Sequence, residues 1–143
     1  MPYRYLEDIA TADVAFEALG GTLEEALVAA ADATMNVMVQ DLDTIADQER
    51  RHVQVEAEAP DMLLFELLQE LIYYKDAEQL LLRVPEVRIC LEADGIRLSA
   101  EAYGERLDPE RHELIVDVKA VTLHRFQVEQ IPEGWRAFVI LDI

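Results

Sequence analysis

Two stretches of the chain repeat apolar residues at helical spacing. In the first, Thr22 is suited to cap a helix and Glu25 follows three positions later, which is a capping-box pattern. The side chains of its buried stripe are Leu23, Leu27, Ala30, Thr34 and Met38. The second opens at Pro60-Asp61, a pair suited to a first helical turn. Its apolar face consists of Leu64, Leu67, Leu68, Leu71 and Ile72. We therefore expect two helices with these faces in the core.

Elsewhere the pattern is typical of strands, with apolar and polar residues alternating. Such stretches lie at 53–57, 87–91, 96–102 and from 114 through 124, while 137–141 is continuously apolar. Asp94-Gly95 predicts a tight hairpin, and the unbroken run at 137–141 predicts a strand covered on both sides. The sequence therefore predicts one α+β domain over residues 1–143, with two helices packed on a single mixed, largely antiparallel sheet in two layers.

The charge balance narrows the classes of function. With 30 acidic and 12 basic residues, the formal net charge is −18, which disfavours direct nucleic-acid binding and favours cations or a basic partner protein. An acidic surface that only keeps the protein in solution is an equally good explanation of the charge alone. Cys90 is the only cysteine, so we expect a reducing, cytoplasmic setting. No apolar run approaches the roughly 20 residues that cross a bilayer, so no membrane association is expected.

Carboxylates stand at the ends of two predicted strands. Asp13 begins an apolar stretch, Asp142 closes the run at 137–141, and Ile143 adds a terminal carboxylate. If these strand ends meet, their oxygens suit a hard cation, Ca²⁺ or Mg²⁺ rather than Zn²⁺. The residues alone leave open a plainer alternative, an aspartate at a sheet edge and a frayed terminus.

Lys119 and His124 stand out among apolar neighbours, either as solvent-facing residues or as functional groups. The three histidines lack the spacing of a zinc site, and no nucleophile elbow, Walker loop or Cys–His pair is present. Nothing in the sequence therefore indicates a catalytic apparatus.

Motifs along the whole chain resemble those of the archease family. They are Thr11-Ala12-Asp13 with Phe16 and Gly20, Thr22-Leu23-Glu24-Glu25-Ala26, Asn36-Val37-Met38, Tyr74-Lys75-Asp76-Ala77-Glu78, Gly104-Glu105 with Asp108, Pro109 and His112, Lys119-Ala120-Val121-Thr122 with His124, and the ending Leu141-Asp142-Ile143. Two positions depart from the family pattern. Ala10 stands where members often carry histidine, and Leu123 where tyrosine is frequent.

The resemblance implies a non-catalytic activator of an RtcB-type RNA ligase in tRNA splicing and RNA repair, which promotes ligase guanylylation and multiple turnover. It also implies a divalent metal held by Asp13, Asp142 and the terminal Ile143, with Ca²⁺ as the first choice and Mg²⁺ or Mn²⁺ as the others. Asp76, Lys119 and His124 are the candidates for the surface that acts on the partner.

Two other functions compete with this hypothesis. The first is a general chaperone or interaction module whose acidic face binds several basic proteins. The second, less favoured, is a metal-dependent hydrolase that uses Asp13 and Asp142, for which no general base is evident. The sequence leaves the oligomeric state open.

Overall fold

The computed structural model describes residues 2–6 and 13–143, which form two helices and a set of antiparallel strands. In chain order the elements are β1 (Tyr3–Leu6), β2 (Asp13–Gly20), α1 (Leu23–Met38), the short 3-10 helix η1 (Leu42–Thr44), β3 (Glu49–Ala57), α2 (Pro60–Glu78), β4 (Leu80–Arg83), β5 (Arg88–Glu92), β6 (Gly95–Arg106), β7 (Ala120–Ile131) and β8 (Gly134–Asp142).

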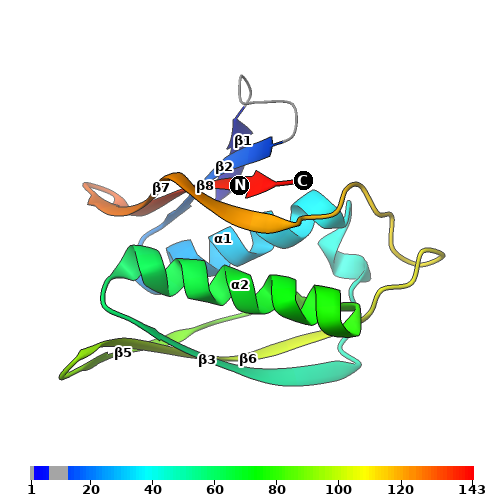
Figure 1. Cartoon of the computed structure of the whole chain (residues 1–143), viewed down its shortest axis with the longest axis horizontal. Helices are drawn as coiled ribbons and strands as arrows, with labels where there is room; N and C mark the ends of the chain where they lie inside the picture. The colour runs from blue at the N-terminus through cyan, green and yellow to red at the C-terminus, as the bar shows by residue number, and fades with distance from the viewer. Residues whose placement is uncertain (1, 7–12) are drawn as a thin grey trace.

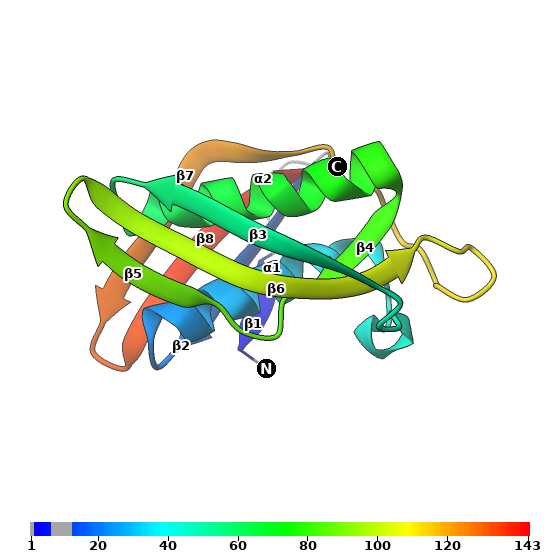
Figure 2. The same cartoon turned by 90° about the horizontal axis from the view of Figure 1, so that it is seen from below.

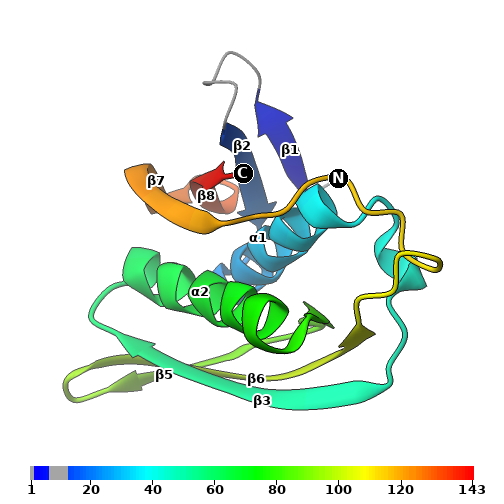
Figure 3. The same cartoon turned by 45° about the vertical axis from the view of Figure 1, so that its right-hand side comes forward.

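The strands form two sheets, with both helices between them (Figures 1 and 3). One sheet has the order β1-β2-β8-β7; in the other, β6 pairs with β3 along one edge and with β4 and β5 along the opposite edge. The predicted α+β class with two helices is confirmed, but there are two sheets in place of one, and every strand pairing of the described residues is antiparallel. Small alanine side chains explain the difference, because they leave α1 buried on nearly every side and let a sheet approach each of its faces.

Local chemistry fixes both helix starts as the sequence predicted. The Thr22 hydroxyl accepts a hydrogen bond from the Glu25 amide at 3.1 Å, and the Glu25 carboxylate accepts one from the Gly21 amide at 3.2 Å. Pro60 occupies the first turn of α2, where its missing N–H costs nothing. Gln79 ends α2 in the left-handed conformation, at φ 53°.

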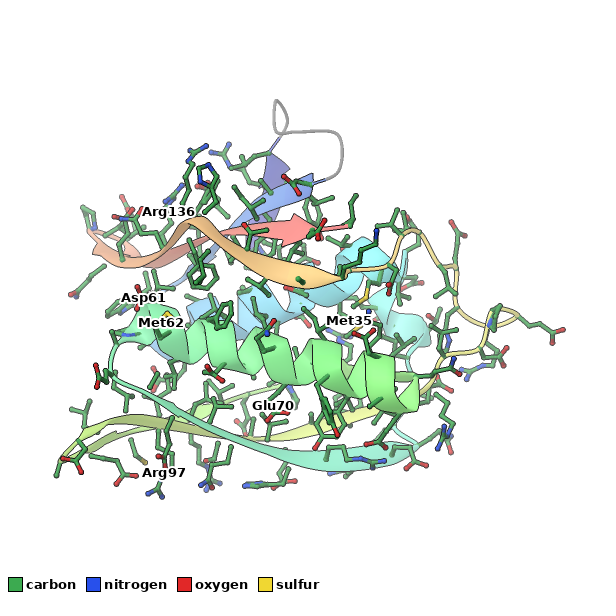
Figure 4. All side chains as sticks on the ribbon, viewed as in Figure 1. Met35, Asp61, Met62, Glu70, Arg97 and Arg136 are labelled. Atoms are coloured by element: carbon green, nitrogen blue, oxygen red, sulfur yellow. The ribbon has the colours of Figure 1, made fainter. Side chains whose placement is uncertain are left out.

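Figure 2 shows the sheet of β3, β4, β5 and β6 from below. Buried and exposed residues alternate along β3 and along most of β6, as predicted. Val53 and Leu98 face the helices, while Arg97 lies on the outer side of the sheet, where it pairs with Glu56 and Glu92 (Figure 4). The predicted turn joins β5 to β6, with Gly95 at φ 151°.

The stretch from 114 to 124 is not the single strand that the sequence suggested. Residues 107–119 cross the end of the molecule outside the named strands, and β7 begins at Ala120. An isolated bridge pairs Leu114 of this segment with Val39, the residue after α1. The pairing of β7 with β8 then shifts between Thr122 and Gln127. The alternating pattern failed here because both segments are extended without belonging to one regular ladder.

Strand β8 is covered on both faces, as its continuous apolar run predicted. One face joins the main core, which also holds Met35 of α1 (Figure 4). The other face contributes Phe138 and Ile140 to a second buried cluster with Ala15 and Leu6, which we call the outer cluster. Within the described residues, no helix is both long and apolar enough to cross a membrane.

Candidate functional site

Asp13 and Asp142 lie directly opposite each other on neighbouring strands. The β2–β8 register pairs Asp13 with Asp142 and continues through Ala15 and Ile140. Opposite residues of an antiparallel pair project to the same face, with Cα atoms about 4.5–5.5 Å apart. Because Ala15 and Ile140 belong to the outer cluster, both aspartates lie on the face of the sheet away from the helices.

The electrostatics of this pair suit a bound cation. Like charges directly opposite in a sheet destabilise it, and neither aspartate forms an ion pair with any other described residue. Within 2–6 and 13–143, no three His, Cys, Asp or Glu side chains are grouped as metal ligands. Ile143, one residue from Asp142, is the third residue of the predicted ligand set. Carboxylate oxygens are the donors that a hard divalent cation prefers.

Lys119 lies beside this pair. Its backbone amide donates to the Asp142 carbonyl at 2.8 Å, and the next residue, Ala120, is the partner of Asp142 in the β7–β8 register. The Lys119 side chain is exposed and has no carboxylate partner among the described residues. The Lys119 backbone thus lies beside Asp142, while its exposed side chain forms no ion pair or hydrogen bond with either aspartate of the described chain.

Asp76 connects to the same end of the molecule through Lys75. The Lys75 ammonium is 6% exposed and forms an ion pair with Asp76 at 2.6 Å. It donates hydrogen bonds to Asp117 and to the Val118 carbonyl, each at 2.7 Å. Lys75 therefore ties the end of α2 to the backbone immediately before Lys119. Our sequence reasoning missed this lysine, although it continues the apolar face of α2 at the spacing of Leu68, Leu71 and Ile72.

Replacing Lys75 with methionine should lower the free energy of unfolding by about 2 kcal/mol, because the buried carbonyl and two carboxylates lose their shared donor. Urea denaturation measures this change. Lys119→Met is the matched control, and its exposed side chain should leave stability within about 0.5 kcal/mol of wild type. Equal stability of the two variants would contradict this stabilising role of the buried Lys75 side chain.

His124 is not brought to the aspartates by any contact of the described residues. It is exposed in the irregular part of β7, next to Arg125, which has a left-handed φ of 57°. The Arg125 guanidinium lies 4.8 Å from the centre of the Phe138 ring and covers the outer cluster. The structure thus brings Asp13, Asp142 and the Lys119 backbone together, with Ile143 next in sequence. It links Asp76 to them only through Lys75 and Val118, and it leaves His124 apart.

A buried polar network, also missed from the sequence, shapes the segment that leads to Lys119. Glu105 is 7% exposed and accepts from the Ala46 amide at 2.6 Å, from His112 Nε2 at 3.1 Å and from Arg111. His112, 1% exposed, in turn accepts from the Asp108 amide at its Nδ1, at 2.9 Å. The network fixes the start of the 107–119 segment.

The same network predicts a dependence of stability on pH. Burial raises the pKa of Glu105, but the hydrogen bonds that the carboxylate accepts outweigh burial and hold the pKa below its ordinary value. A lowered folded-state pKa stabilises the protein above the unfolded pKa of about 4.5 and loses this contribution as the pH falls through the folded value. As the pH drops below about 4.5, the urea concentration at the midpoint of unfolding should therefore decrease. Glu105→Gln should make this decrease smaller. An equal loss of stability at low pH in wild type and Glu105→Gln would contradict the role given to Glu105.

Comparison with known proteins decides the family. A model of the Archease protein family (MTH1598/TM1083) matches residues 3–143. The archease of Pyrococcus abyssi is 42% identical over 134 residues, which cover 93% of this chain and 94% of that protein. The archease of Methanopyrus kandleri is 34% identical with both chains fully covered. The chain belongs to the archease family.

Solved structures agree with the archease fold. The solution structure of Methanobacterium thermoautotrophicum protein 1598 matches with a TM-score of 0.85 and 34% identity, covering 99% of each chain. The crystal structure of an archease, described as a possible chaperone, from Thermotoga maritima matches with a TM-score of 0.64 over 96% of this chain and 97% of its own; at 21% identity it supports the fold alone.

Several archease motifs have a visible structural purpose. Gly104 lies so close to β4 that a Cβ atom would be 1.7 Å from the Leu81 carbonyl oxygen, and Glu105 and His112 form the buried network. The motif residues Thr11 and Ala12, and the departure at Ala10, lie outside the described residues.

Proposed function

We propose that this archease chain activates an RtcB-type RNA ligase, promoting its guanylylation and its multiple turnover in tRNA splicing or RNA repair. Family membership supports the proposal, and one observation of the structure carries it. The β2–β8 register sets Asp13 opposite Asp142, one residue before Ile143, and neither aspartate forms an ion pair with another described residue.

We infer that these three residues hold a divalent cation. Oxygen-only donors favour Ca²⁺, with Mg²⁺ and Mn²⁺ as the other candidates. A cation bound there would supply positive charge for the phosphates of a nucleotide or RNA end. The strand pairing orients the two side-chain carboxylates before any cation binds, so little ordering entropy is lost on binding.

Lys119 is proposed to meet an anionic group of the ligase or of its nucleotide. The side chain is exposed, and its backbone is held in place by the hydrogen bond to Asp142. Asp76, 58% exposed beside Lys75, and His124 on β7 complete the surface proposed to act on the partner. This division assigns contact with the ligase to these three residues and cation binding to the aspartates.

The overall charge supports a protein partner over RNA itself. A chain with a net charge of −18 would repel RNA phosphates, whereas an RNA ligase needs basic surfaces for its substrate, toward which an acidic protein is steered.

A broader role as a chaperone for several basic proteins is the second candidate, favoured by the same net charge. Affinity capture from an extract separates the two functions. One dominant ligase supports activation, whereas many basic clients support the chaperone role.

Guanylylation of the ligase from the same organism tests the proposal. With GTP and a divalent cation, the wild-type chain should accelerate transfer of GMP to the ligase. Lys119→Ala should reduce this acceleration while leaving the unfolding curve unchanged, because the side chain is exposed. A folded wild-type chain that gives no acceleration would refute activation.

A further inference from the structure

Three consecutive large apolar side chains are exposed in the segment before β7. Leu114, Ile115 and Val116 are 41%, 49% and 39% exposed, and no other exposed large apolar residues of the described chain are adjacent in sequence. Contiguous exposed apolar surface marks an interaction site far more often than isolated exposed residues do. We call residues 114–117 the 114–117 edge.

The backbone of this edge is hydrogen-bonded on one side. The Ile115 amide donates to the Met38 carbonyl at 2.9 Å, and the Gln40 amide donates to the Glu113 carbonyl at 2.8 Å. Backbone groups of an extended segment alternate sides, so the amide and carbonyl of Leu114 and Val116 face the other way. They have no backbone partner among the described residues. This is the free edge on which an added strand forms its ladder.

The surroundings of the edge are negative. Both helices end there (Figures 1 and 3), and helix C-termini carry partial negative charge. The last turn of α1 has no basic residue, and in α2 the charge of Lys75 is already shared by Asp76 and Asp117. A hollow of about 240 Å³ lies against the edge, lined by Met38, Lys75, Leu81 and Leu107.

The charges also argue against a second copy as the occupant. Antiparallel pairing of two copies centred on Ile115 would place Glu113 of one copy opposite Asp117 of the other, and like charges directly opposite are destabilising. The opposite arrangement, with Lys or Arg at both flanks of an apolar segment, would pair favourably with the same two residues. The edge thus favours a basic partner.

We propose that the 114–117 edge accepts, as an added strand, an extended segment of a partner protein with apolar residues between flanking Lys or Arg residues. The inference rests on the proposed function only in taking the RNA ligase as the protein that carries this segment. Apolar side chains of the segment would enter the hollow, and its backbone would bond to Leu114 and Val116.

The test compares binding of the purified ligase to wild type and to Leu114→Lys/Val116→Lys by calorimetry. The added cations oppose a basic segment, so the Kd should rise about ten-fold or more. Leu19→Lys/Leu91→Lys, two exposed leucines outside the edge, is the matched control and should bind within about two-fold of wild type. Hydrogen exchange of the wild-type complex gives a second readout, in which the amides of Leu114 and Val116 become protected.

The outcomes separate the two proposals. If wild type binds the ligase but the 114–117 variant binds equally well and neither amide gains protection, the docking surface is wrong and activation stands. If wild type neither binds nor stimulates the ligase, the proposed function fails and takes the ligase segment with it. A concentration-dependent dimer that protects the two amides without ligase would reassign the edge to a second copy and overturn the inference.

Discussion

The double substitution Asp13→Asn/Asp142→Asn should weaken calcium binding about 100-fold or more, because it removes two of the three anionic ligands of the proposed site. In metal-free buffer the same variant should be as stable as wild type or more stable by about 0.2–1 kcal/mol, since the cross-strand repulsion is gone. Thermal unfolding across a calcium titration measures both effects, because a ligand that binds only the folded state raises the Tm.

The expected loss of calcium binding without a loss of metal-free stability distinguishes a metal site from a structural role. A purely structural role for the aspartates would lower stability with and without calcium. Asp94→Asn is the control for loss of a surface charge, since it removes one negative charge from the exposed turn between β5 and β6 and keeps a sequence that suits the turn. A calcium-dependent rise in Tm that is equal in wild type and the double variant would place the cation elsewhere.

Gly104→Ala should lower the free energy of unfolding by about 3 kcal/mol or more. The added Cβ would lie 1.7 Å from the Leu81 carbonyl oxygen and 2.7 Å from its carbon, and both atoms belong to the backbone of β4. Either the β4–β6 ladder separates at Leu82, the register partner of Gly104, or the sheet shifts around it. Chemical denaturation checks the magnitude.

Gly21→Ala is the control for this substitution. Its added Cβ would meet only the Glu25 carboxylate at 3.5 Å, an ordinary contact, so stability should change by less than about 0.5 kcal/mol. Equal losses in the two variants would mean that the close approach of β4 does not determine the cost at Gly104.

The elements that could be predicted are those with local determinants. Thr22 and Glu25 specify the start of α1, Pro60 specifies that of α2, and Gly95 specifies the hairpin, each through contacts within a few residues. The division into two sheets could not be predicted in this way. It depends on which strands pair across long separations and on the small side chains that let α1 be buried on all sides.

The candidate site also combines features that the local sequence reveals with features that depend on long-range pairing. Strand-end positions identified Asp13 and Asp142, but only the β2–β8 register shows that they face each other. Lys75 was overlooked because a lysine on an apolar helix face is normally assigned to solvent, whereas here its ammonium is satisfied by Asp117, 42 residues away. Glu105 and His112 depend in the same way on a loop whose path the sequence does not reveal.

Ligation turnover depends directly on whether the paired carboxylates take part in activation of the ligase. RNA ends joined per ligase molecule are counted under excess substrate, with the wild-type chain and with the Asp13→Asn/Asp142→Asn variant. We expect many turnovers with wild type and, with the variant, no more than the ligase achieves alone, while both chains remain folded. Full turnover with the folded double variant would contradict the central claim that the paired carboxylates are what the archease chain uses to activate the ligase.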